Sequence, residues 1–373
     1  MGFSYRISWW GSNLKELFYS MLRKYPFYMK ATFIMLGMVI LVFILSILRD
    51  ILVPLSFALL LSILLNPLAG LLEKWQFPRV LAITISILLA MVLILGVTYF
   101  LFLEVRSFSS ELPVFKEKFQ ELLIKLQHWA RHDIGIATKK QNEYLNAAED
   151  GLKPVLATAM GSVMGAIAMF FLLPVYTFLF LFYKKLILAF LYQLFEKAEE
   201  KEISVVLTQT KGAIQSYMYG LLLEAMIVAT LNTCALMILG VQYAVLLGIL
   251  GALLNILPFI GGILAVLFPI LIATATKDGF QTQLWIMVAY IIIQFIDNHF
   301  LVPYIVASKV KINALVSIVV VLLGGSLWGI SGMFLSIPFI GVLKIIFDRL
   351  PELKPWGMLI GMEVPTKRRF KSR

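Results

Sequence analysis

A few polar side chains stand in otherwise apolar stretches of the sequence, and they are the residues best suited to chemistry. Asp297 and Asn298 interrupt a run that reads IMVAYIIIQFI before them and FLVPYIV after His299. Glu224 and Asn232 lie in the apolar segment GLLLEAMIVATLN. Because an ionisable group inside lipid is costly, each acid is a functional candidate. A carboxylate there would bind a cation or a proton, or accept hydrogen bonds from a hydroxylated solute.

Each candidate also has a structural interpretation. Asn232 follows Glu224 by eight residues and shares its helical face, so we expect the two to share a cavity. Alternatively, the Glu224 side chain reaches back to the inner membrane interface. The alternative for Asp297 is an ion pair at the end of a span, with Lys309, Lys311 or His299. His299 titrates near neutral pH, but a single interfacial histidine is more often structural.

The composition determines the class of protein that must hold these groups. The chain has 373 residues, of which 61% are hydrophobic and 14% charged, with a mean hydropathy of +0.92. Soluble domains carry about 25% charged residues, so a soluble protein is excluded. Several apolar runs approach the ~20 residues that cross a bilayer. We therefore predict an all-α polytopic membrane protein with about eight transmembrane segments, including broken or re-entrant helices.

The formal charge of +11 is concentrated near the two ends of the chain. Basic flanks favour the cytoplasmic side, which places both termini inside the bacterial inner membrane. Spans are expected at 31–48, 51–65, 80–103, 155–183 (kinked at Pro174) and about 218–239. The predicted organisation is a cytoplasmic or interfacial N-terminus 1–30, spans one to three in 31–103, an extracytoplasmic helical insertion 104–152, span four in 153–183, a cytoplasmic amphipathic helix 184–217, a transport core 218–347 and a basic cytoplasmic tail 348–373.

The insertion carries a heptad pattern of apolar residues. Their alternating spacing of four and three residues forms a seam along one helix face. Such a seam packs either against its own subunit or against a second copy, and the second reading predicts a homo-oligomer. The seam residues are Leu112, Phe115, Phe119, Leu122, Leu126 and Trp129.

Two later segments, 241–276 and 312–347, are almost unbroken apolar runs of 36 residues each. A straight helix of that length would measure about 54 Å, whereas a hydrocarbon core is ~30 Å thick. Each run must therefore be broken, as a re-entrant hairpin, as two crossings or at proline kinks in packing helices. The expected breaks are at Asn255, Pro258 and Gly261–Gly262 in the first run, and at Gly324–Gly325, the WGISG stretch and Pro338 in the second.

The two runs resemble each other. GILGALLNILPFIG (248–261) and GISGMFLSIPFIG (329–341) share Gly-Ile-x-Gly, a polar residue and Pro-Phe-Ile-Gly. Paired interrupted helices are the best sequence indication of a transporter's substrate site. We predict substrate or ion binding by Asp297, Asn298, Glu224, Asn232, Asn255 and Ser336. The predicted pathway backbone and hinges are Pro258, Gly261, Gly262, Pro303, Gly324, Gly325, Gly332, Pro338 and Gly341.

The order of these motifs resembles a known family. LLNILPFIGG, FIDNHFLVPYIVASKVKINALVSIVVVLLGG and LWGISGMFLSIPFIGVLK are similar to segments of the bacterial autoinducer-2 exporter family, the PerM-like permeases. Two residues depart from the family pattern: Ser308 replaces a common glycine, and His299 replaces an apolar residue. The resemblance implies a multi-pass, oligomeric inner-membrane permease. Some relatives are associated with autoinducer-2 export and others with sodium or proton antiport.

We therefore expect a secondary transporter of a small polar solute, with an autoinducer-2-like signalling molecule as one candidate. The alternatives are a sodium (cation)/proton antiporter and a non-transporting membrane scaffold. The sequence has no P-loop, hydrolase triad or metal-ligand cluster, and Cys234 is its one cysteine. An enzyme, a cofactor and a bound metal are accordingly not expected. The expected partners are membrane lipid, the solute or ion, and further copies of the chain. The basic tail is assigned to anionic headgroups rather than nucleic acid.

Overall fold

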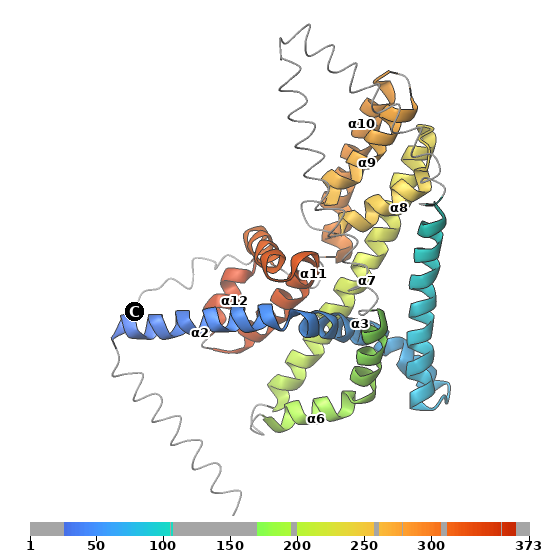
Figure 1. Ribbon diagram of the computed structural model, residues 1–373. Helices are drawn as coiled ribbons and strands as arrows, with labels where there is room; N and C mark the ends of the chain where they lie inside the picture. The colour runs from blue at the N-terminus through green and yellow to red at the C-terminus, as the bar shows by residue number, and fades with distance from the viewer. Residues whose placement is uncertain are drawn as a thin grey trace, which may run out of the picture. The chain divides into compact units, whose positions relative to one another are not determined.

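The computed structural model describes residues 26–104, 106, 170–194, 200–256, 261–277, 279–306, 312–351 and 353–362. These residues are almost entirely helical (Figure 1), which confirms the predicted all-α class. The chain divides into two compact units, Met1–Leu52 and Val53–Arg373, each described here by itself. The heptad seam, most of the N-terminal segment and most of the basic tail lie outside the described residues.

The helices follow one another along the chain with short connections. Their bounds are α2 (Phe27–Ile47), α3 (Arg49–Lys74), Arg79–Glu104, Phe170–Phe182, α6 (Lys184–Leu194), α7 (Glu200–Ile238), α8 (Ala244–Asn255), α9 (Gly261–Thr276), α10 (Gln281–Ile296), the π-helical η2 (Asp297–Val306), α11 (Ala314–Arg349) and α12 (Lys354–Ile360).

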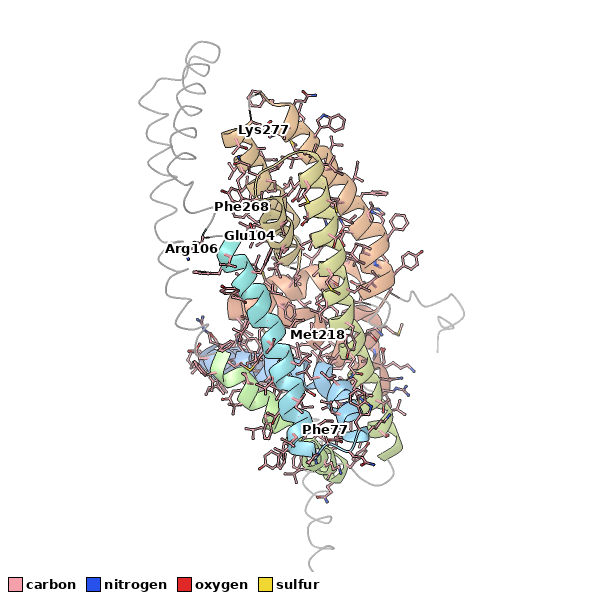
Figure 2. All side chains as sticks on the ribbon, turned by 90° about the vertical axis from the view of Figure 1, so that its right-hand side faces the viewer. Phe77, Glu104, Arg106, Met218, Phe268 and Lys277 are labelled. Atoms are coloured by element: carbon pink, nitrogen blue, oxygen red, sulfur yellow. The ribbon has the colours of Figure 1, made fainter. Side chains whose placement is uncertain are left out.

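Many of these helices have the length and composition of membrane spans. Among the described residues, five helices are long and apolar enough to cross a bilayer, or up to six if the bent pair Phe170–Phe182 and Lys184–Gln193 is one span. Figure 2 shows side chains projecting all along the helix that ends at Glu104, most of them carbon-rich. Within the first unit, α2 is apolar all round and largely exposed, as expected of a helix in lipid. A polytopic membrane protein is confirmed, whereas the number of about eight segments stays a prediction.

Helix α3 is tied to α7 where a proline interrupts its hydrogen bonds. Pro67 lies inside α3 and has no N–H to donate to the carbonyl of Ile63. The side chain of Gln215 on α7 donates to that carbonyl at 2.8 Å, and the hydroxyl of Tyr219 donates to the neighbouring carbonyl of Leu64 at 3.1 Å. Side chains of α7 thereby satisfy backbone groups that lipid cannot.

The fourth predicted span bends at a different residue from the one expected. The helix continues through Pro174, and the chain turns by 59° between Phe170–Phe182 and the following helix. The guanidinium of Arg79 donates to the carbonyls of Leu181 and Phe182 at 3.0 and 2.7 Å. Because carbonyls at a helix end lack intrahelical partners, these bonds stabilise the bend, and the expected kink at Pro174 is wrong.

Helix α7 is longer than the predicted fifth span. It begins at Glu200 and continues without a break to Ile238. The segment that we expected to form a separate surface helix up to residue 217 is therefore, from Glu200 onward, continuous with the span. The same helix packs against α8, η2 and α11, which makes it the backbone of the second unit (Figure 1).

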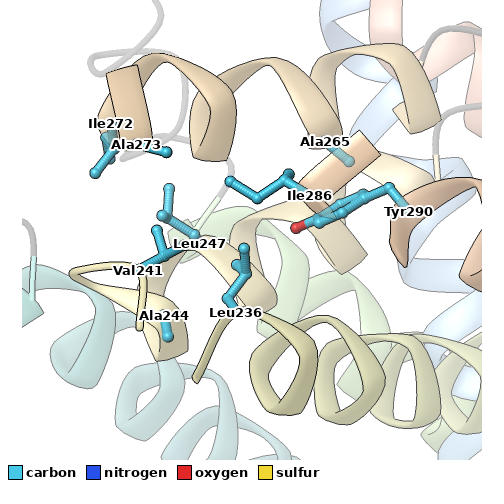
Figure 3. Packing of buried hydrophobic residues seen from close by; sticks show 9 residues of the cluster. All are labelled: Leu236, Val241, Ala244, Leu247, Ala265, Ile272, Ala273, Ile286 and Tyr290. Atoms are coloured by element: carbon cyan, nitrogen blue, oxygen red, sulfur yellow. The ribbon is translucent and has the colours of Figure 1, made fainter. Parts of the chain in front are cut away.

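Helices α8 and α9 form a hairpin. Ala244 and Leu247, near the start of α8, pack with Ile272 and Ala273, near the end of α9 (Figure 3). At the other end, a Cβ on Gly251 would lie 3.4 Å from the Cβ of Ala265. The two helices therefore run antiparallel, as expected for a re-entrant segment. With 12 and 16 residues, each is shorter than the ~20 residues of a full crossing.

Helix α11 also folds back on itself. A straight helix would separate Val320 from Ser336 by about 24 Å, yet the Ser336 hydroxyl donates to the Val320 carbonyl at 2.9 Å. The turn is at Trp328 and Gly329, where Gly329 has φ 63°. This positive φ suits glycine. The arms 314–327 and 330–349 pack so closely that a Cβ on Gly324 would lie 2.5 Å from the Gly332 carbonyl oxygen.

This hairpin corrects part of the predicted second break. The break within the WGISG stretch is confirmed, whereas the helix continues through Gly324–Gly325 and Pro338. The similar motifs also occupy different places: residues 248–261 include the whole link from α8 to the start of α9, whereas 329–341 begin at the turn and continue into one arm. Sequence similarity therefore does not mark equivalent positions in the two hairpins.

Asn313 joins the two ends of the second hairpin. Its Oδ1 accepts from the N–H of Val316 at 2.9 Å and caps α11, as asparagine does at helix N-termini. Its amide nitrogen donates to the carbonyls of Leu359, Ile360 and Gly361, at 2.6, 3.1 and 3.1 Å. The end of α12 is thereby held against the start of α11.

Candidate functional site

A cavity of about 900 Å³ lies in the second unit, lined by residues from α7, α8, α9, α10, η2 and α11. Most of its wall is apolar, and its polar groups come from four of these elements. They include Glu224 from α7, Asn255 from α8, Gln294 from α10, and Asp297 and Asn298 from η2. A largely apolar cavity with a few convergent polar groups is the usual form of a small-molecule site.

The two predicted acids meet at this cavity. Glu224 and Asp297 are 7% and 2% exposed within the protein, and their carboxyl groups are in hydrogen-bonding contact. Helix α7 packs against η2, which brings together two residues that are far apart in the sequence. The interpretation of Glu224 as a side chain reaching for the membrane surface is therefore wrong. A hydrogen bond between two carboxyl groups requires a proton, so the pair can hold and release one.

Asp297 is oriented by two amide groups. The Nδ2 of Asn255 donates to Oδ2 of Asp297 at 2.8 Å, and the Nε2 of Gln294 approaches the same oxygen at 3.4 Å. The Nε2 of Gln294 is also 3.4 Å from Oδ1 of Asn298. The second carboxyl oxygen of Asp297, Oδ1, is buried without a hydrogen-bond partner among the described residues. The amides thus hold one oxygen in place and leave the other available.

The change of helix type places Asp297 at a junction. Helix α10 ends at Ile296, and the π-helical η2 begins with Asp297 and contains Pro303. Proline removes a backbone donor, and π-helical turns in proteins occur frequently at functional sites. Tyr290, Gln294 and Asp297 are spaced by four and three residues, so they project from one face of this segment. The polar stripe faces α7 and the α8–α9 hairpin.

A second, much smaller cavity of about 10 Å³ adjoins the first. It is lined by Asn232, Gly251, Asn255, Tyr290 and Asp297, among others. Glu224 and Asn232 therefore do share a helix face, but they line adjacent cavities. Asp297 lies at both.

Two predicted hinge glycines are in close contact with the site. A Cβ on Gly262 would lie 2.5 Å from Oε1 of Gln294, so this glycine lets Gln294 reach Asp297 and Asn298. A Cβ on Gly261 would clash with the backbone of Leu254, so this glycine permits the tight approach of α9 to α8. Pro258 lies outside the described residues.

Several other predicted residues are placed away from this site. Ser336 donates to the carbonyls of Val320 and Gly332 and so closes the α11 hairpin rather than facing the cavities. The remaining predicted hinge residues of α11 lie in or beside this hairpin contact: Gly324, Gly325, Gly332, Pro338 and Gly341.

His299 also faces away from the carboxyl pair. Its ring is exposed, stacks on Phe295 with centroids 4.3 Å apart, and its Nδ1 lies 3.0 Å from the Phe295 carbonyl oxygen. The structural interpretation of His299 fits this position. Lys309 and Lys311, the other suggested partners of Asp297, lie outside the described residues.

Sequence reasoning missed three contributors: Gln294, Tyr290 and Gly251. Gln294 and Tyr290 precede Asp297 by three and seven residues, so a helical plot centred on Asp297 would have found them. Gly251 gave no local signal, because its role depends on the side chains of two other helices.

The comparisons with known proteins agree with this arrangement. The model of the AI-2E family of transporters matches residues 32–352. The AI-2 transport protein TqsA of Escherichia coli K12 is 28% identical over 85% of this chain and 91% of its own length. The putative transport proteins YrrI and YueF of Bacillus subtilis 168 are each 24% identical over 80% of this chain, and 86% and 84% of their own lengths.

The family match spans the described helices from within α2 to the end of α11, and it includes every residue of the two cavities. Together with the apolar helices, it supports a permease-type transporter with multiple passes through the bacterial plasma membrane. The chain belongs to the AI-2E transporter family.

Proposed function

We propose that this permease moves a small polar solute through the 900 Å³ cavity, with Asp297 as the main polar contact. The observation that carries the proposal is the convergence of two carboxyl groups and three carboxamides on one largely apolar cavity: Glu224, Asp297, Asn255, Gln294 and Asn298. Carboxyl and carboxamide oxygens accept hydrogen bonds, and the amide nitrogens donate them. A small molecule rich in hydroxyl groups matches this set of donors and acceptors.

An autoinducer-2-like signalling molecule is one candidate solute. It is the cargo in the printed name of TqsA, which is 28% identical to this chain. The expected gating unit is the pair of hairpins within residues 218–347, moving against α3 and the other early spans. Both hairpins end inside the protein rather than crossing it, as transporter segments that line a pathway do.

A second candidate is cation/proton antiport, which the Glu224–Asp297 contact favours. Two carboxyl groups this close share a proton, because two negative charges would repel strongly in a low-dielectric site. Binding of a cation would displace that proton. The same residues would then exchange one monovalent cation for one proton without changing the charge of the site.

The test is a flux assay in proteoliposomes with a panel of small hydroxylated solutes and an imposed pH gradient. Asp297→Asn keeps the size of the side chain, removes the carboxylate and is expected to abolish flux. The matched control is His299→Ala, two residues away on the same segment but facing outward, which is expected to keep wild-type flux.

The outcomes separate the two candidates. Uptake of a solute that is lost in Asp297→Asn supports solute transport. Sodium-dependent collapse of the pH gradient without solute uptake supports antiport. Wild-type activity in Asp297→Asn would refute the assignment of Asp297 in either case.

A further inference from the structure

We propose that the 10 Å³ cavity beside Asp297 is a binding site for one dehydrated monovalent cation, Na⁺ or Li⁺, held by Asn232, Tyr290 and Asp297. The observation behind this proposal is the coincidence of one small cavity with three buried oxygen atoms that lack hydrogen-bond partners. They are Oδ1 of Asn232, the hydroxyl of Tyr290 and Oδ1 of Asp297. All three residues line the cavity, and they are 2%, 7% and 2% exposed.

Buried polar atoms almost always have partners, and each exception requires an explanation. Within the described residues, four buried side-chain polar atoms lack a partner, and three of them belong to this one cavity. The fourth, Oε1 of Gln283, is two turns away on α10 and lines neither cavity. The clustering indicates a missing ligand rather than scattered defects in packing.

The glycine on α8 shows that the oxygens converge. A Cβ on Gly251 would lie 3.1 Å from the amide nitrogen of Asn232 and 3.6 Å from the Tyr290 hydroxyl. Any larger residue at position 251 would therefore intrude where these two side chains meet. The absence of a side chain leaves room for a ligand of about the size of one water molecule.

The chemistry of the three oxygens selects the ligand. A carboxylate oxygen and an amide oxygen only accept hydrogen bonds, and a tyrosine hydroxyl also has lone pairs to offer. Oxygen ligands of this kind suit hard cations. Because Oδ2 of Asp297 is already held by Asn255, the free Oδ1 is the one charged ligand. One monovalent cation would offset the negative charge of the Glu224–Asp297 pair, which a neutral water molecule would not.

The position also suggests a use. Asp297, Asn255, Tyr290 and Gln294 line both cavities, so a cation at Oδ1 would orient the carboxyl group that faces the solute. This coupling role rests on the proposed function, whereas the cation site itself does not.

The test uses the purified full-length chain in detergent at constant ionic strength. Thermal unfolding is followed while N-methylglucamine chloride is replaced by NaCl, LiCl or KCl. A ligand that binds the folded state raises the midpoint in a saturable way. We expect such a rise with Na⁺ or Li⁺ and little rise with K⁺.

Three variants remove the site in different ways. Tyr290→Phe removes one oxygen, Asn232→Leu replaces the amide with an apolar group of similar size, and Gly251→Ala fills the cavity. The half-saturating Na⁺ concentration should rise by roughly tenfold or more in each, corresponding to the loss of ~1.4 kcal/mol or more of binding free energy.

Two controls are matched in chemistry and burial. Tyr217→Phe removes a buried hydroxyl outside the small cavity, and Gln283→Met removes the unpartnered amide on the same helix as Tyr290. Both should keep the wild-type response to Na⁺.

The results are decisive in both directions. Equal midpoints in NaCl and N-methylglucamine chloride for the wild type would overturn the proposal, and the cavity would then hold a water molecule. A wild-type response in Tyr290→Phe and Asn232→Leu would overturn it as well. Flux measured with and without Na⁺ separates this inference from the proposed function. Solute flux that ignores Na⁺ refutes only the coupling role, and a Na⁺ response without solute flux refutes only solute transport.

Discussion

The close contact between the two arms of α11 makes a quantitative prediction for Gly332→Ala. A Cβ at this position would clash with the Gly324 carbonyl oxygen and lie 2.7 Å from its carbonyl carbon and 2.9 Å from the Cβ of Trp328. Ordinary contacts of this kind begin near 3.4 Å. The arms must therefore move apart by at least several tenths of an ångström, against the hydrogen bond from Ser336 to Val320.

The magnitude follows from two opposing effects. Overpacking of a well-packed contact costs about 1–3 kcal/mol, while alanine in place of a helical glycine contributes about 0.5–1 kcal/mol of stability. Gly212→Ala on α7 is the matched control, because no other residue lies within 4 Å of the added Cβ. Gly212→Ala should be more stable than the wild type, and Gly332→Ala less stable.

Thermal unfolding of the purified variants in one detergent, at one NaCl concentration, measures the difference. We expect the midpoint of Gly332→Ala to fall below that of the wild type and the midpoint of Gly212→Ala to lie at or above it. Equal midpoints for the two variants would show that Gly332 faces lipid rather than Gly324, and the folded-back hairpin would be refuted.

Two further predictions test the same region. In a Cys234→Ser background, Val320→Cys with Ser336→Cys should form a disulfide within the subunit on mild oxidation, whereas Val205→Cys with Leu221→Cys, equally spaced on the continuous helix α7, should not, because about 24 Å separates them; equal cross-linking of the two pairs, read by mass spectrometry after proteolysis, would contradict the hairpin. Asn313→Ala should lower the free energy of unfolding by about 1–2 kcal/mol through loss of the helix cap and should also expose α12 to proteolysis, whereas Asn313→Asp keeps the capping oxygen and should lose less; an unchanged unfolding midpoint in Asn313→Ala would contradict the role of Asn313 in joining α11 to α12.

The amino-acid sequence was sufficient for the class of the protein and for its most important residues. Long apolar runs require helices in lipid, because every backbone polar group must be satisfied within the segment. The same cost makes Asp297 and Glu224 conspicuous. The excessive length of the two late runs showed that each must be broken, and both contain a hairpin. These conclusions depend only on local composition and length.

The positions of helix breaks were harder to predict. Pro174 and Pro338 were expected to interrupt helices, but both helices continue through them. The bend after Phe182 depends on Arg79, a residue from another helix that satisfies the exposed carbonyls. Proline only removes a donor, and the surrounding structure decides whether the helix bends there or elsewhere.

Only the tertiary structure decided which polar residues act together. Glu224 meets Asp297 because α7 packs on η2, and Asn232 meets Tyr290 because Gly251 leaves space between them. Ser336, an equally good candidate by its motif, instead closes the α11 hairpin. A sequence records the cost of burying each polar group, but the partner that offsets this cost comes from a distant helix. The identity of the site residues was therefore largely a property of the sequence, and their pairing was a property of the fold.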